Sequence, residues 1–215
     1  AWLERQRALR DDWRSTLGGI AGTAKGLHPA ALFQALAPEI PRDAVIAWDG
    51  GDFTHWGRAT VPARIGGGWL RLGPLGTIGS ALPNAFALKL AHPDKPVVMI
   101  TGDGSLGFYL AELDSLVRFG LPVVIIVGND AGWGLERELQ GEIQGSTVAC
   151  ELRATRYDTI MKGFGGAGET ITRVDQVAPA MRRALASGKP YLINARIQAA
   201  RSPFTDWQLG GKARR

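Results

Sequence analysis

The residues best suited to chemistry are a short glycine-rich turn that carries a carboxylate. This turn, Gly102-Asp103-Gly104-Ser105, lies between an apolar run and an amphipathic segment. Glycine lets backbone N–H groups approach a phosphate closely, and the start of a helix adds a favourable dipole. A carboxylate beside a diphosphate is repulsive unless a cation lies between them, and Mg²⁺ prefers carboxylate, carbonyl and phosphate oxygens. The turn therefore favours a site for magnesium and a diphosphate.

A second polar pair, Asn129-Asp130, strengthens this interpretation. Twenty-four residues separate the pair from Gly104, which is room for one helix and one apolar strand. Neighbouring parallel strands end at the same edge of a sheet, so the two motifs can meet there. Alone, a Gly-Asp-Gly in a chain with 29 glycines is weak evidence, and a tight turn capped by Asp is its structural alternative. The second motif makes the binding interpretation the stronger one.

A parallel sheet covered by helices would place these turns together. Apolar runs alternate with amphipathic segments, and each run is short and apolar along its length, as in strands buried on both faces. The predicted strands are 44–48, 97–101, 123–127 and 191–197, and the predicted helices are 29–36, 78–91, 106–119 and 174–186. We expect an α/β fold with a doubly wound, mostly parallel sheet and helices on both faces.

The combination resembles the signature of thiamine-diphosphate-dependent enzymes, in which Gly-Asp-Gly is followed at this distance by a pair of asparagines. The segment Gly76-Thr77-Ile78-Gly79-Ser80-Ala81-Leu82-Pro83 is similar to the segment that bends the cofactor in that family. The similarity runs from about residue 28 to 197 and is closest to the acetolactate synthase-like branch. One residue departs from the pattern, because Asp130 stands where the family usually has Asn and adds a negative charge.

The resemblance implies roles for individual residues. Asp103, Asp130 and the backbone carbonyl of Gly132 would bind Mg²⁺, and no catalytic residue is expected in this chain, because the family's activating glutamate lies on a separate domain. For the cofactor, Gly102, Gly104 and Ser105 would contact the diphosphate, and Gly51, Asp52 and Phe53 would form a second diphosphate-contacting turn. The Gly76 carbonyl would accept a hydrogen bond from the cofactor's amine, and Ile78 would support the bent shape of the cofactor. Asp130, Gly132 and Trp133 would contact the cofactor from the metal loop. For Trp133, a position in the core is an equally good interpretation.

The three histidines and the single cysteine are weaker candidates. His28 suits a helix cap or a surface position, and His92 suits a helix end where it compensates the dipole. His55 could face the cofactor, but a packing role is the better interpretation. Cys150 has no neighbouring histidine in the sequence, which favours a structural or surface thiol over a nucleophile.

Composition limits the classes of binding partner that the chain is expected to have. A net charge of +5 and a pI near 9.7 would suit nucleic acid or an anionic membrane. However, the basic residues are mostly spread along the chain, with no interleaved aromatic motif of an RNA or single-strand binder, and no apolar stretch reaches the roughly 20 residues of a membrane span. We therefore expect neither partner. One cysteine cannot form an intramolecular disulfide, so we expect a cytoplasmic setting.

The chain divides into three predicted parts. Residues 1–26 are expected to be a helical extension from an absent upstream domain, 27–198 the thiamine-diphosphate domain, and 199–215 a tail that forms a lid. We expect substrate selection by the segment 136–147, by the tail and by the absent domains, one of which could carry FAD. The resemblance implies a homodimer or homotetramer.

The predicted activity follows from the resemblance. We expect a thiamine-diphosphate- and Mg²⁺-dependent enzyme that acts on a 2-oxo acid or an acyl-CoA by decarboxylation, carboligation or the reverse cleavage. The alternative branch contains 2-hydroxyacyl-CoA lyase and oxalyl-CoA decarboxylase, where the second metal motif normally continues into Asn-Asn-Gly and a Tyr, near the position of Trp133 here. A non-catalytic domain that kept the fold is the alternative from another class, and the intact motifs argue against it.

Overall fold

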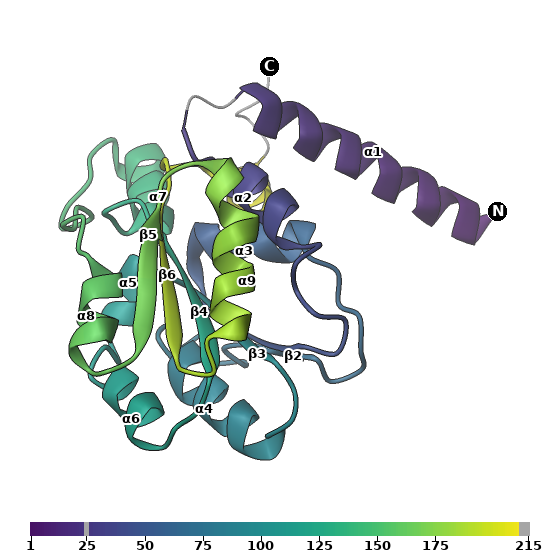
Figure 1. The fold of residues 1–215 in the computed structure, drawn as a ribbon. Helices are drawn as coiled ribbons and strands as arrows, with labels where there is room; N and C mark the ends of the chain where they lie inside the picture. Colours follow the sequence, from purple (N-terminus) through teal and green to yellow (C-terminus); the bar gives the residue numbers. More distant parts are fainter. Residues whose placement is uncertain (24–25, 211–215) are drawn as a thin grey trace.

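The computed structural model describes residues 1–23 and 26–210, which are built around a six-stranded sheet (Figure 1). The strands are β1 (Val45–Trp48), β2 (Trp69–Leu70), β3 (Val97–Gly102), β4 (Val123–Asn129), β5 (Ala167–Ile171) and β6 (Tyr191–Arg196). Their order is β2-β1-β3-β4-β6-β5, and each neighbouring pair is parallel. The expected α/β fold with a parallel sheet is confirmed.

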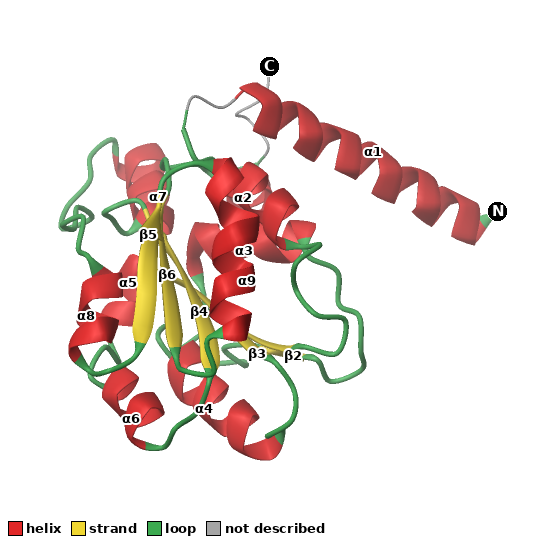
Figure 2. Ribbon diagram, in the orientation of Figure 1, coloured by secondary structure: helices red, strands yellow, loops and turns green. Residues whose placement is uncertain are grey.

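Helices cover both faces of this sheet (Figure 2). They are α1 (Trp2–Thr23), α2 (Pro29–Leu36), α3 (Gly51–Thr60), α4 (Ala81–Ala91), α5 (Asp103–Gly107), α6 (Glu112–Arg118), α7 (Gly134–Gln144), α8 (Tyr157–Gly163), α9 (Val177–Ala186) and α10 (Pro203–Gln208). Two separate hydrophobic clusters show which helix covers which face: α2, α3 and α9 pack on one side, and α4, α6 and α8 on the other.

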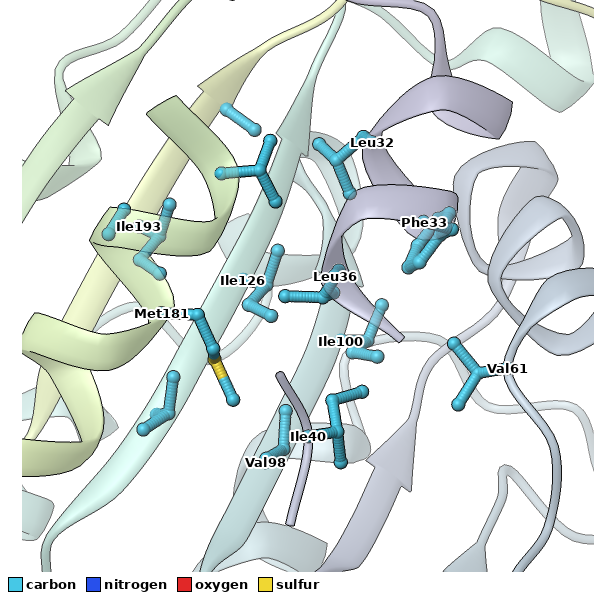
Figure 3. Packing of buried hydrophobic residues seen from close by; sticks show 14 of the residues in the cluster. Leu32, Phe33, Leu36, Ile40, Val61, Val98, Ile100, Ile126, Met181 and Ile193 are labelled. Carbon is cyan, nitrogen blue, oxygen red and sulfur yellow. The ribbon is translucent and has the colours of Figure 1, made fainter. Parts of the chain in front are cut away.

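The alternation of side chains along each strand creates these two clusters. In β3, Val98 and Ile100 face the helices α2 and α9, whereas Val97 and Met99 face α4 and α6. Figure 3 shows the first cluster, in which helix and strand side chains interdigitate: Leu32, Phe33, Leu36, Val98, Ile100, Ile126, Met181 and Ile193. Burial on both faces explains why the central strands are apolar at almost every position.

The structure corrects several predicted boundaries. The four predicted strands are present to within two residues, but β2 and β5 were not predicted. The helix expected over 78–91 begins at Ala81, because Gly79 has a φ of 84° that no right-handed helix can hold. The helix expected over 106–119 is two helices, α5 and α6, and the first ends at Gly107, a residue that weakens helices. The helix expected over 174–186 starts with a 3₁₀ turn, Val174–Gln176.

Helix α1 extends from the body of the molecule (Figure 1). The expected helix is therefore present, and its second half is attached: Leu17 is buried, and Trp13 Nε1 donates to the Ala59 carbonyl at 2.8 Å. The division between extension and domain stays a prediction, and parts of the predicted extension and tail, residues 24–25 and 211–215, lie outside the described residues. Within the described part, no helix combines the length and the apolar character needed to cross a bilayer.

Candidate active site

The strand order creates a crevice at the carboxyl ends of the strands. From β1 the chain passes through α3 to β2, whereas from β3 it passes through α5 and α6 to β4, on the opposite side. These connections leave neighbouring strands in opposite directions and on opposite faces of the sheet. In open α/β sheets, such a switch point is where ligands bind.

The residues predicted from the sequence meet in one pocket at this crevice. The pocket is lined by Gly51, Asp52, Phe53, Ile78, Gly102, Asp103, Gly104, Ser105, Asp130, Gly132 and Trp133, together with residues that the sequence did not single out, among them Gly50, Gly128 and Arg137. Gly76 is the exception, since it lies in an exposed turn that does not line the pocket. Residues 51–53 form the first turn of α3 rather than a loop.

Asp103 and Asp130 form the acidic part of the pocket. Burial, followed by the charge of Asp130, raises the pKa of Asp103 from its ordinary 3.8 to about 7. Burial also raises the pKa of Asp130, although the Arg137 guanidinium opposes the rise. A buried and a partly buried carboxylate that both resist ionisation are stabilised by a cation between them. Among the described residues, no group of three or more His, Cys, Asp or Glu side chains is arranged to hold a metal ion, so such a cation needs further oxygens, which the Gly132 carbonyl and a diphosphate can supply.

The loop that carries Asp130 is held in a strained conformation. Ala131 has a φ of 57°, a left-handed value that is unusual for a residue with a Cβ. The Ala131 carbonyl accepts the Leu152 N–H at 2.8 Å, and the Cys150 carbonyl accepts the Trp133 N–H at 2.7 Å. These contacts aim the loop at the pocket, and the Cys150 thiol is buried beside them, as expected for a structural cysteine.

Asn129 fixes the start of the same loop. Its side-chain amide donates to the Thr155 carbonyl at 2.9 Å and to Asn194 Oδ1 at 3.0 Å, and it is fully buried. Asn194 in turn donates to Thr170 at 3.0 Å. The first residue of the Asn-Asp pair therefore positions the loop, while the second faces the pocket.

Trp133 closes one side of the pocket over the diphosphate turn. An added Cβ at Gly104 would lie 2.7 Å from the Trp133 ring, so only glycine fits beneath it. Trp133 also packs edge-to-face against Phe108, with ring centroids 5.9 Å apart. Trp133 thus packs against a neighbouring ring and lines the pocket at once, and its role in cofactor binding stays a prediction.

Asp49 joins two of the turns, a role that the sequence analysis missed. Its Oδ1 accepts the N–H of Gly50 at 2.8 Å and that of Gly79 at 2.9 Å, and its Oδ2 accepts the Thr101 hydroxyl at 3.1 Å. This fully buried carboxylate thus links the end of β1, the segment before α4 and the end of β3. Its position directly after an apolar strand was the available signal.

Asp52 connects the pocket to the C-terminal tail. Its Oδ1 accepts the Thr205 hydroxyl at 2.5 Å, and the His55 Nδ1 lies 3.8 Å away. Burial opposes ionisation of Asp52, but hydrogen bonds from His55, Ser202 and Thr205 outweigh it and lower the pKa. Oδ2 is buried without a hydrogen-bond partner in the described part of the chain. Asp52 therefore lines the pocket as an ionised carboxylate whose Oδ2 is closed off from solvent.

The wall formed by α7 is attached through ion pairs. Arg201 lies 2.7 Å from both Glu138 and Glu142, and α7 itself contains no buried residue. Residues 134–138 of α7 line the pocket, and the last three of them belong to the segment 136–147 that was expected to select the substrate. Within the predicted tail, Pro203–Gln208 form α10, which bonds Asp52 through Thr205 and also contacts α7.

The histidines play structural roles. His28 Nδ1 accepts the Ala30 N–H at 3.0 Å and caps α2, so the predicted cap is confirmed, whereas the surface alternative is wrong because the residue is buried. His55 packs against Phe204 at a centroid distance of 4.5 Å, which favours the packing interpretation. His92 lies at the end of α4, as expected.

Comparisons with known proteins agree with this geometry. Residues 49–195 match the family model described as "Thiamine pyrophosphate enzyme, C-terminal TPP binding domain". A probable acetolactate synthase from Mycobacterium bovis is 40% identical over 169 residues, which are 78% of this chain and 31% of that protein. The human 2-hydroxyacyl-CoA lyase 2 is 35% identical over 215 residues, which cover 97% of this chain and 34% of that protein.

A solved structure has the same fold. The thiamine diphosphate-dependent 4-hydroxybenzoylformate decarboxylase of Rhodococcus jostii RHA1 aligns with a TM-score of 0.77 at 26% identity, over 84% of this chain and 34% of that one. This chain thus spans about a third of the length of these relatives.

Proposed function

Because this chain belongs to the thiamine pyrophosphate enzymes through their C-terminal cofactor-binding domain, we propose that it holds the diphosphate and Mg²⁺ end of thiamine diphosphate in an enzyme that makes or breaks carbon–carbon bonds next to a carbonyl. The observation that carries the proposal is the meeting of Asp103, Asp130 and the turns after β1 and β3 in one pocket. No single one of these motifs would be specific enough.

The residues of the pocket fit that cofactor. Asp103, Asp130 and the Gly132 carbonyl would hold Mg²⁺, whose charge would offset the burial and the repulsion by Asp130 that together raise the pKa of Asp103. Backbone groups of Gly104 and Ser105 would bind the diphosphate, and Ile78 would support the bent cofactor. When bound, thiamine diphosphate supplies the electron sink for cleavage or formation of the carbon–carbon bond.

Calorimetric titration with thiamine diphosphate, with and without Mg²⁺, tests the proposal. We expect binding that requires Mg²⁺ and is abolished by Asp103→Ala. The matched control is Asp114→Ala, which removes a half-exposed carboxylate on α6 and should leave binding unchanged. Binding that is unaffected by Asp103→Ala would refute the site, and no Mg²⁺-dependent binding by the wild type would favour a non-catalytic domain.

For the reaction, we propose the acetolactate synthase-like type acting on a 2-oxo acid, supported by 40% identity to a probable acetolactate synthase. The second candidate is a lyase acting on 2-hydroxyacyl-CoA, supported by the match of 97% of this chain to a protein of that name. Product analysis of the full-length protein, with pyruvate or a 2-hydroxyacyl-CoA, separates the two. Formation of acetolactate supports the first, and release of an aldehyde from the CoA substrate supports the second.

We further propose that the complete enzyme is a cytoplasmic homodimer or homotetramer. Another domain would supply the glutamate that activates the cofactor, and a middle domain could carry FAD. The proposal rests on the family's organisation and on the size of the relatives, of which this chain spans about a third. Light scattering of the full-length protein tests the assembly, and a monomer that turns over substrate would refute it.

A further inference from the structure

Arg137, which the sequence analysis did not single out, lies beside the proposed metal ligand Asp130. Its Nη1 lies 3.5 Å from Asp130 Oδ2, and the two side chains are only 19% and 13% exposed. This is the position at which the chain departs from the usual Asn of the family and gains a negative charge. An arginine therefore accompanies the unusual carboxylate inside the pocket.

The position of Arg137 is fixed by two further residues. Its Nε donates to Glu151 Oε1 at 2.9 Å, and a bridge between Gly132 and Glu151 holds this partner next to the metal loop. A Cβ added to Gly132 would overlap Arg137 Nη2 and lie 2.8 Å from its Cζ. The glycine in the loop thus makes room for the guanidinium, and the arrangement is built by residues from three segments.

Charge explains what this arrangement achieves. An Asn at position 130 would be neutral, whereas an ionised Asp130 faces Asp103, the ionised Asp52 and any bound diphosphate. A partly buried carboxylate without a counter-ion is costly. Arg137 offsets one charge, and Glu151 is 73% exposed, so water screens its own charge.

We propose, on the basis of the proposed cofactor function, that Arg137 is a positioning residue that neutralises Asp130, so that the Asp130–Arg137 pair presents to Mg²⁺ and diphosphate the same net charge as the family's Asn. The pair, rather than Asp130 alone, replaces the asparagine. Arg137→Met should therefore be harmful only while residue 130 is an aspartate.

A double-mutant cycle on Arg137→Met and Asp130→Asn tests this dependence. At saturating Mg²⁺, Arg137→Met should weaken thiamine diphosphate binding about tenfold, whereas in the Asp130→Asn background it should change the affinity less than twofold. Arg137→Lys keeps the charge and should restore most of the affinity. The control Arg201→Met removes another arginine near the pocket and should have the same effect in both backgrounds.

Urea denaturation of the same metal-free variants gives a readout that needs no cofactor. Arg137→Met should lower the midpoint, and the added Asp130→Asn should recover it. Equal effects of Arg137→Met in both backgrounds, in binding and in denaturation, would overturn the proposal and indicate that Arg137 acts alone, for example on a substrate anion. If the wild type does not bind thiamine diphosphate, the proposed function fails, and the denaturation cycle alone decides the coupling.

Discussion

Asp103 should make the stability of the metal-free protein depend on pH in an unusual direction. Its pKa is raised from 3.8 to about 7, by burial and then by the charge of Asp130. Below pH 3.8 the side chain is protonated in both the folded and the unfolded states, so its raised pKa does not change the free energy of unfolding. Between pH 3.8 and 7 only the unfolded state loses the proton, so stability falls as the pH rises and stays low above pH 7.

The size of the effect follows from the two pKa values. Each pKa unit corresponds to about 1.4 kcal/mol, so the full penalty is about 4 kcal/mol. About 3 kcal/mol of this penalty develops between pH 5 and pH 8, because two of the roughly three pH units between the unfolded and the folded pKa lie in this range. This is a large part of the roughly 5–15 kcal/mol that stabilises an ordinary domain.

Urea denaturation followed by tryptophan fluorescence measures the effect, with EDTA present, at several pH values from 5 to 8. The Asp103→Asn variant is the control, because it keeps the size of the side chain but cannot titrate. We expect the wild type to lose about 3 kcal/mol more than this variant across the range. Saturation with Mg²⁺ and thiamine diphosphate should flatten the wild-type profile. Parallel profiles for the two metal-free proteins would refute the raised pKa.

Three further predictions concern other parts of the site. Ile78→Ala should reduce turnover of the full-length enzyme far more than cofactor affinity, because Ile78 shapes the bound cofactor. Equal losses of turnover, measured by kinetics, and of affinity, measured by calorimetry, would show that Ile78 is only a packing residue. Thr205→Val should destabilise the protein by about 1–3 kcal/mol in urea denaturation, because Asp52 loses its short hydrogen bond. Thr205→Ser keeps the hydroxyl and should retain the stability, so equal stabilities of the two variants would contradict a role for this hydrogen bond. The 215-residue chain alone should show no turnover and no accelerated exchange of the thiazolium proton by NMR, and enzymatic exchange would show that one of its own acids activates the cofactor.

The central strands were predictable, and the edge strands were not, for a physical reason. The predicted strands β1, β3, β4 and β6 occupy the middle of the sheet, where both faces are buried and the sequence must be apolar throughout. The missed strands β2 and β5 are its two edges. β2 has only two residues, and β5 includes Gly168 and the partly exposed Glu169, so neither presents an apolar run.

The site was predictable where it depends on local spacing. Asp103 and Asp130 follow buried strands, and the sheet alone brings them together. Arg137 was missed because its role comes from Glu151 and from the empty space at Gly132, contacts that no spacing rule expresses. Sequence reasoning therefore identified most of the residues that line the pocket, whereas it missed contacts, such as those of Arg137, that hold the pocket in shape.

The ion-pair attachment of α7 has a consequence for access to the pocket. This helix contains no fully buried residue, so its detachment would mainly break ion pairs. These are the pairs of Arg201 with Glu138 and Glu142 and those of Arg137 with Asp130 and Glu151. Segments of this kind open at free energies far below that of global unfolding. We therefore expect the wall formed by α7 to open locally while β3 and β4 stay folded, so that amide hydrogens of α7 exchange with solvent long before those of the central strands.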